Sequence, residues 1–150
     1  MSRPSSDVAI CNLALSLLKE SRISVLSGTG VSEVGALCAQ WYDVIRQSTL
    51  MAYNWNFALV SFAIPRGGTP SVSDYTDYYT FPNDYLKLRA IVDPVVPLGQ
   101  RQFEIQGRDL YYSYGGATSL PIWYTKDVTD ISLYPALFIK LLAEELALVL

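Results

Sequence analysis

The sequence predicts an α+β fold, a small helical bundle with an antiparallel β-sheet or sandwich inserted between its second and third helices. Apolar residues recur every three or four positions after residues 7, 32 and 135, which is the period of a helix. Between the second and third helical segments they alternate with polar residues or form short runs bounded by Gly, Pro and Asn, as in strands. We therefore expect one domain over residues 1–150, with a helical frame at 1–57 and 132–150 and a β insertion at 58–131.

The first two helices have recognisable starts. Ser5 or Ser6 is expected to cap a helix that runs from Asp7 to about Lys19, and a loop over residues 21–30 leads to a second helix that begins near residue 32. Spacings of three and four predict that the second helix has one apolar face, made of Val34, Leu37, Cys38, Trp41 and Ile45, with Arg46 largely elsewhere. Its apolar face therefore requires a partner. The two cysteines, Cys11 and Cys38, are interpreted as buried free thiols.

The β insertion is expected to consist of about six short strands. They are predicted at residues 59–64, 75–81, 86–92, 103–106, 109–112 and 122–125. Pro65 is expected to end the first strand, and residues 66–71 to form an exposed loop. Gly107-Arg108 is the two-residue turn of a predicted hairpin.

The last helix is predicted from Pro135 to Leu150. Lys140 and Glu144 lie one turn apart on it as a surface pair. It ends without Gly, Asn or Pro, so we expect the natural chain to continue. No membrane span and no secretory signal are expected, because charged residues interrupt the apolar runs.

Composition narrows the classes of function. The hydrophobic fraction is 51% against 17% charged residues, which indicates apolar surface that meets another chain. A formal net charge of −3 argues against a protein that grips nucleic acid. The sequence has no His, no GxGxxG and no P-loop, so no catalytic residue, cofactor or metal is expected.

Two groups of residues, the carboxylates and the tyrosines of the β region, allow alternative functions. Carboxylates at Asp74, Asp77, Asp84, Asp127 and Asp130 could act as acid and base or bind a hard cation, but capping of turns and solvation is the favoured interpretation. Tyrosines crowd the β region and could stack on sugars or bases, although packing and subunit contact are favoured. Trp41, Trp55 and Trp123 are interpreted as core anchors.

Several segments together carry a resemblance to a known family. They are Ile10–Leu15, Trp41-Tyr42, Trp55-Asn56-Phe57-Ala58, the run from Phe81-Pro82-Asn83-Asp84 to Arg89, Phe103–Gly107 and Ile122-Trp123-Tyr124. In this order they resemble the head-to-tail adaptor, or tail tubular protein A, family of tailed bacteriophages.

The resemblance implies a virion structural protein without cofactors. Family members form a twelvefold connector ring at the head–tail junction, bind the portal protein, extend the DNA ejection channel and receive the next tail or nozzle protein. The protein would be made in the host cytoplasm, and DNA would pass through without specific binding. Neighbouring subunits are then expected to contact the helix faces near Arg46 and Lys140, and the portal or tail partners the loops at 66–74, 94–100 and 115–120. The candidate contact residues are Arg46, Arg66, Gly67, Gly68, Thr69, Asp74, Leu98, Gln100, Gly115, Gly116 and Lys140.

Two other classes of function stay open. One is a carbohydrate-binding β module with a tyrosine platform. The other is a hydrolase that uses Asp77 or Asp130.

Overall fold

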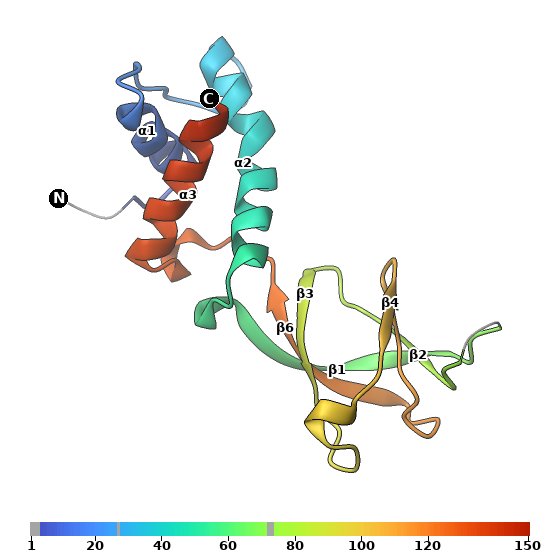
Figure 1. Ribbon diagram of the computed structural model, residues 1–150. Coiled ribbons are helices and arrows are strands. Elements are labelled where there is room, and N and C mark those ends of the chain that lie inside the picture. The colour runs from blue at the N-terminus through green and yellow to red at the C-terminus, as the bar shows by residue number, and fades with distance from the viewer. Residues whose placement is uncertain (1–3, 27, 72–73) are drawn as a thin grey trace. The chain divides into compact units, whose positions relative to one another are not determined.

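The computed structural model describes residues 4–26, 28–71 and 74–150. In these ranges the chain has three α-helices and one six-stranded antiparallel sheet, which is inserted between the second and third helices (Figure 1). The predicted α+β class is therefore confirmed. The chain forms two compact units, one made of Met1–Phe57 with Val128–Leu150 and one made of Ala58–Asp127. That both act as one domain stays a prediction.

The helical unit contains α1 (Asp7–Leu17), α2 (Glu33–Ala52) and α3 (Ala136–Val149). The third helix packs against both of the others (Figure 1). Ser6 Oγ caps α1 by accepting from the Ala9 amide at 3.1 Å, and Ser32 caps α2. The predicted start of each helix is thus confirmed, while α1 ends two residues before the expected Lys19.

An aromatic cluster joins the segment after α2 to the start of α3 within the helical unit. Phe138 of α3 makes edge-to-face contacts with Trp55, Phe57 and Tyr134, with ring centroids 5.2, 5.0 and 4.7 Å away. Trp55 Nε1 also donates to the Thr49 carbonyl at 3.0 Å. These contacts fix the segment after α2 against the start of α3.

Asn12 attaches the loop after α1 through a polar contact. Its side chain is buried, accepts from the Ile23 amide at 2.8 Å and donates to the Ile23 carbonyl at 3.0 Å. Cys11 and Cys38 are both buried and free, as the sequence predicts. Burial, together with the neighbouring Cys38 thiol, raises the pKa of Cys11 above its ordinary value.

The buried face of α2 differs from the predicted one. It consists of Gly35, Cys38, Tyr42, Arg46, Thr49 and Leu50. Val34 is exposed instead of buried, and Arg46, which was expected largely elsewhere, is only 7% exposed. Arg46 fits the core because its guanidinium pairs with the Asp43 carboxylate and lies 5.9 Å from the Tyr42 ring centroid.

Removing the hydroxyl group should have different effects on stability at Tyr42 and at Tyr134. The buried Tyr42 hydroxyl has no hydrogen-bond partner among the described residues, whereas the buried Tyr134 hydroxyl donates to the Val128 carbonyl. Tyr42→Phe should leave the free energy of unfolding unchanged or raise it by about 1 kcal/mol, because it removes an uncompensated desolvation cost. Tyr134→Phe should lower it by about 1–2 kcal/mol. Urea unfolding of both variants measures the difference, and equal losses would contradict the assignment.

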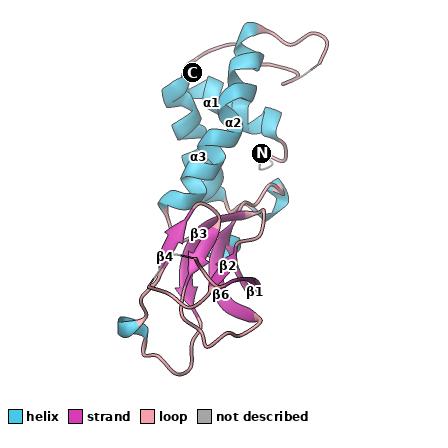
Figure 2. Cartoon of the chain, turned by 90° about the vertical axis from the view of Figure 1, so that its right-hand side faces the viewer, coloured by secondary structure: helices cyan, strands magenta, loops and turns pink. Residues whose placement is uncertain are grey.

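The second unit is a single curled sheet (Figure 2). Its strands are β1 (Leu59–Gly68), β2 (Tyr78–Thr80), β3 (Tyr85–Ile91), β4 (Glu104–Gln106), β5 (Asp109–Tyr111) and β6 (Ser119–Lys126), in the spatial order β3-β6-β1-β2-β5-β4. All neighbouring strands are antiparallel. The core consists of Ile64, Tyr79, Phe81, Ile91, Leu110, Tyr112, Leu120, Ile122 and Tyr124.

Strand β1 is longer than predicted. It pairs with β6 from Leu59 to Pro65 and continues through Arg66 to Gly68, where it pairs with β2 across a register shift. Pro65 does not end the strand, and Arg66, Gly67 and Gly68 are not part of a loop. A proline is compatible with this position because the next amide, that of Arg66, donates to the Thr118 carbonyl at 3.0 Å and continues the pairing.

Two large aromatic side chains of the sheet, Phe62 of β1 and Trp123 of β6, are exposed. Most of β1 is not buried, and Phe62 is exposed. Trp123, which pairs with Ser61 across β6 and β1, is 40% exposed, so its assignment as a core anchor is wrong. The alternation of side chains along an antiparallel strand places it on the opposite face from the buried Ile122 and Tyr124.

The predicted β4–β5 hairpin is confirmed. Its strands pair with Gln106 opposite Asp109 across the turn Gly107-Arg108. Gly107 has φ of +60°, and Arg108 is not among the residues with positive φ. A positive φ at the first turn position alone is what a type II′ turn requires, and glycine adopts it without steric cost.

Gly67 should tolerate no side chain. A Cβ atom there would lie 2.1 Å from Cε2 of the Tyr78 ring. Gly67→Ala should therefore lower the free energy of unfolding by about 1–3 kcal/mol, because the ring and the strand have to separate. Gly99→Ala is the control, since its Cβ would meet no atom within 4 Å, and we expect a change within about 0.5 kcal/mol. Equal free energies of unfolding for the two variants in urea would show that the close approach of Gly67 to the Tyr78 ring does not limit stability.

Candidate functional site

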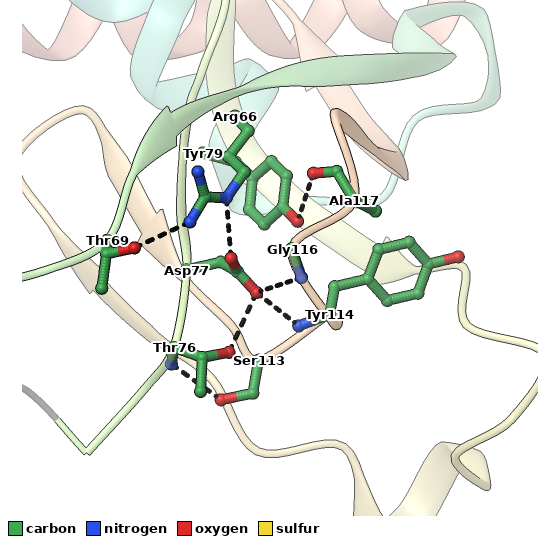
Figure 3. Close-up of polar contacts among 9 residues, drawn as sticks. All are labelled: Arg66, Thr69, Thr76, Asp77, Tyr79, Ser113, Tyr114, Gly116 and Ala117. Carbon is green, nitrogen blue, oxygen red and sulfur yellow. Dashed lines mark hydrogen bonds and ion pairs between the residues drawn. The ribbon is translucent and has the colours of Figure 1, made fainter.

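The most densely bonded polar group of the sheet unit surrounds Asp77 (Figure 3). Its carboxylate is only 1% exposed. One oxygen accepts from Arg66 Nε at 2.7 Å, and the other accepts from the Tyr114 amide at 2.9 Å, the Gly116 amide at 3.2 Å and Thr76 Oγ1 at 2.9 Å. We call these five residues the Asp77 cluster. Four donors on one carboxylate leave it little capacity for a ligand.

Local sequence explains how the donors converge. Gly115 and Gly116 have φ of +64° and +74°, which allows a tight turn closed by the Ala117 amide donating to the Tyr114 carbonyl at 3.2 Å. This turn points two amides at Asp77. The Tyr79 hydroxyl donates to the Ala117 carbonyl at 3.0 Å and fixes the turn from the strand side (Figure 3).

The electrostatics of the Asp77 cluster favour a permanent anion. Burial alone would raise the pKa of Asp77, but hydrogen bonds from the Tyr114 amide, the Arg66 side chain and the Gly116 amide outweigh it and lower the pKa to about 2. A general acid or base needs a pKa near the working pH and a free oxygen facing the reactant. Asp77 has neither, so its geometry suits a structural anchor.

A second buried carboxylate, Asp93, lies at the start of the loop after β3. It accepts from the Tyr112 hydroxyl at 2.5 Å and from the Val95 amide at 2.9 Å. These hydrogen bonds outweigh burial and lower the pKa of Asp93. Arg101 donates to the backbone carbonyls of Ile91, Asp93 and Val96, at 2.7 Å to Asp93 and 2.9 Å to Val96. Neither residue was predicted from the sequence to have a role, although Asp93-Pro94 is a turn-forming dipeptide.

Two other predicted carboxylates, Asp84 and Asp130, serve as structural acceptors. Asp84 accepts from the Tyr124 hydroxyl at 2.9 Å, and Asp130 accepts from the Ser132 amide at 3.0 Å at the start of a short 3₁₀ helix. The capping interpretation is confirmed for Asp130. The interpretation of Asp77 as a solvated carboxylate is wrong, because residues distant in sequence bury its side chain. Within the described ranges, no group of three or more His, Cys, Asp or Glu side chains is placed to hold a metal ion.

Several tyrosines of the sheet unit belong to its core or pack against it. Tyr79, Tyr112 and Tyr124 are buried, and the Tyr85 ring stacks on Phe81 with centroids 3.7 Å apart. The packing interpretation is confirmed for these four tyrosines. A tyrosine platform would need side chains from the half-buried remainder, and their role in subunit contact stays a prediction.

The predicted contact residues fall into three groups. Those exposed are Gly67, Thr69, Asp74, Leu98, Gln100, Gly115, Gly116 and Lys140. Arg66 and Gly68 are half-buried, and Arg66 is held by Asp77 and by Thr69 Oγ1 at 2.8 Å. Arg46 is buried and therefore does not belong to an exposed helix face. Residues 72 and 73 of the predicted 66–74 loop lie outside the described residues.

The helical unit carries a surface groove that sequence reasoning did not find. It has a volume of about 580 Å³ and is lined by Tyr53, Asn54, Trp55, Leu137, Lys140, Leu141 and Glu144. Tyr53 and Leu137 are well exposed, and the Lys140 ammonium lies 3.9 Å from a Glu144 carboxylate oxygen. Only Lys140 of these residues was a predicted contact. The groove is apolar with one internally balanced ion pair.

No protein-family model matches the chain, and no curated protein sequence matches it.

Within residues 4–26, 28–71 and 74–150, none of the helices combines the length and the apolar character that a membrane crossing requires.

The Asp77 cluster predicts a specific dependence of stability on pH. Because its pKa falls from 3.8 to about 2 on folding, Asp77 stabilises the fold above pH 3.8, and this contribution disappears as the pH falls toward 2. Asp77→Asn should cost about 3 kcal/mol at pH 7, and its difference from the unaltered chain should shrink between pH 4 and pH 2. Urea unfolding at several pH values measures this.

The matched control for this experiment is Asp74→Asn, which removes one exposed carboxylate three residues away. It should change the free energy of unfolding by less than about 0.5 kcal/mol at neutral pH. A loss in Asp77→Asn that does not vary with pH would contradict the ionised cluster.

Proposed function

We propose that this protein is a virion structural protein, a ring-forming head-to-tail adaptor that joins the portal to the tail and extends the DNA channel. The observation that carries the proposal is the order of elements, two helices, a six-stranded sheet and a third helix. The family resemblance found in the sequence implies the same order. With this function the protein would not be an enzyme and would need no cofactor.

The state of the buried acids supports a building block over a catalyst. Asp77 is saturated by four donors, and Asp93 is bonded to a tyrosine hydroxyl and to loop amides. A hydrolase that used Asp77 would have to break these bonds to free an oxygen for its substrate. Asp130, the other candidate, caps a short helix through Ser132.

Exposed apolar side chains support contacts between chains. Val95 is 84% exposed, Leu98 72%, Leu137 66% and Leu148 79%. Isolated exposed apolar residues are common, but two on one short loop, Val95 and Leu98, and one in the lining of a groove, Leu137, are typical of protein contact sites. The proposed partners are further copies in a twelvefold ring, the portal protein and the next tail or nozzle protein, at the head–tail junction of the virion.

Net charge supports a channel that DNA does not adhere to. With a formal net charge of −3, the chain lacks the excess of Lys and Arg that neutralises phosphates in DNA-gripping proteins. DNA would therefore slide through the ring. Of the predicted loops, 66–74 and 115–120 remain the proposed sites for portal or tail contacts. Arg46 is left out because it is buried.

A carbohydrate-binding module is the second candidate. The observation in its favour is an exposed aromatic ring on the sheet, that of Trp123. Flat exposed rings of this type stack on sugars. Such a module would be a monomer whose tryptophan fluorescence shifts when polysaccharide is added, and this shift would be lost in Trp123→Ala.

Native mass spectrometry tests the adaptor proposal directly. The purified chain is measured alone and after mixing with the portal ring of the same phage. We expect a twelvefold species in one or both samples, because excess apolar surface and a portal template both favour assembly. A monomer that ignores the portal at all concentrations would contradict the proposal.

A further inference from the structure

The loop after β3 presents apolar side chains from a fixed base. Residues 94–100 contain no charged residue. At the base, Asp93 accepts from the amides of Val95 and Val96, and Arg101 binds three carbonyls across the loop. The loop and its short helix are yellow in Figure 1. A rigid base lowers the entropic cost of docking the two exposed residues, Val95 and Leu98.

The groove on the helical unit is the complementary feature. Its wall includes the exposed Leu137 and Tyr53, and its volume of about 580 Å³ is enough for more than one side chain. Its two charges, on Lys140 and Glu144, balance each other at 3.9 Å. An uncharged apolar segment therefore covers the groove without burying an unpaired charge, whereas an acidic or basic segment would leave one uncompensated.

We propose that the 94–100 loop of one copy inserts Val95 and Leu98 into the groove of the next copy. The occupant is a second copy because the chain carries both the protruding loop and the uncharged apolar groove that suits it. A contact between two different patches of identical chains is heterologous, and such contacts generate closed rings when the rotation closes. The inference rests on the proposed ring, and it assigns to a neighbouring copy the loop at first expected to meet portal or tail.

The first experiment compares three variants that each place one charge on an exposed leucine. Leu98→Asp alters the loop, Leu137→Asp alters the groove, and Leu148→Asp is the control on the same helix outside the groove lining. Each is mixed with the portal ring and measured by native mass spectrometry. Leu98→Asp and Leu137→Asp should lower the twelvefold fraction at least about tenfold, as expected when a buried anchor is lost. Leu148→Asp should assemble normally, and circular dichroism should be the same for all three.

The second experiment locates the contact between copies. Leu98→Cys chains are mixed with affinity-tagged Leu137→Cys chains under assembly conditions and treated with a short bismaleimide. Cys11 and Cys38 are buried and should not react. Because each chain carries only one added thiol, a cross-linked product containing one tagged and one untagged chain must join two copies. Leu148→Cys replaces Leu137→Cys in the control and should give little of this product.

The outcomes separate this inference from the proposed function. If the unaltered chain forms the ring but the Leu98–Leu137 pair gives no more product than the control, the loop-to-groove contact is wrong and the adaptor proposal survives. The loop-to-groove contact is equally wrong if Leu98→Asp and Leu137→Asp assemble normally. If the unaltered chain forms no ring with or without the portal, the proposed function fails and this contact fails with it.

Discussion

The sheet unit depends on one ion pair, between the buried Asp77 and the half-buried Arg66. Arg66 lies where β1 leaves β6 and begins to pair with β2, and Asp77 lies directly before β2. The same carboxylate binds the turn that leads into β6. One anion thus fixes three segments that are more than ten residues apart in sequence, and burial without these donors would cost several kcal/mol. The close approach of Gly67 to the Tyr78 ring follows from the same crossing of strands.

The parts of the fold that sequence predicted are those with local causes. Helix caps, the helical period and the Gly107-Arg108 turn act within a few residues, so the helices and the hairpin were identified correctly. Pro65 is a local stop signal, but β6 and β2 pair with β1 on either side of it and override the signal. The α2 face was misjudged because Arg46 was treated as a charge, although its long stem packs like an apolar residue.

The candidate sites show the same division between local and distant causes. Capping by Asp130 involves a residue two positions away and was predicted. The partners of Asp77 lie up to 39 residues away, so nothing near it in sequence distinguishes it from a solvated turn residue. Asp93 and Arg101 were missed for a related reason, since Arg101 binds carbonyls and leaves no pattern of opposite charges. The groove could not be predicted because it requires the packing of α3 against the end of α2.

The distribution of polar and apolar groups is consistent with the proposed assembly into a ring. Buried acids would be expected to face a substrate in a catalyst, yet here they bind backbone amides and set the shape of loops. The exposed surface includes an uncharged loop anchored at its base and an apolar groove. A ring of identical copies closes only if every contact repeats the same angle between neighbours. A flexible loop would allow a range of angles, and its ordering on docking would cost entropy and weaken the contact. Anchoring the loop at Asp93 and Arg101 is therefore what the proposed docking of one copy on the next would require of this chain.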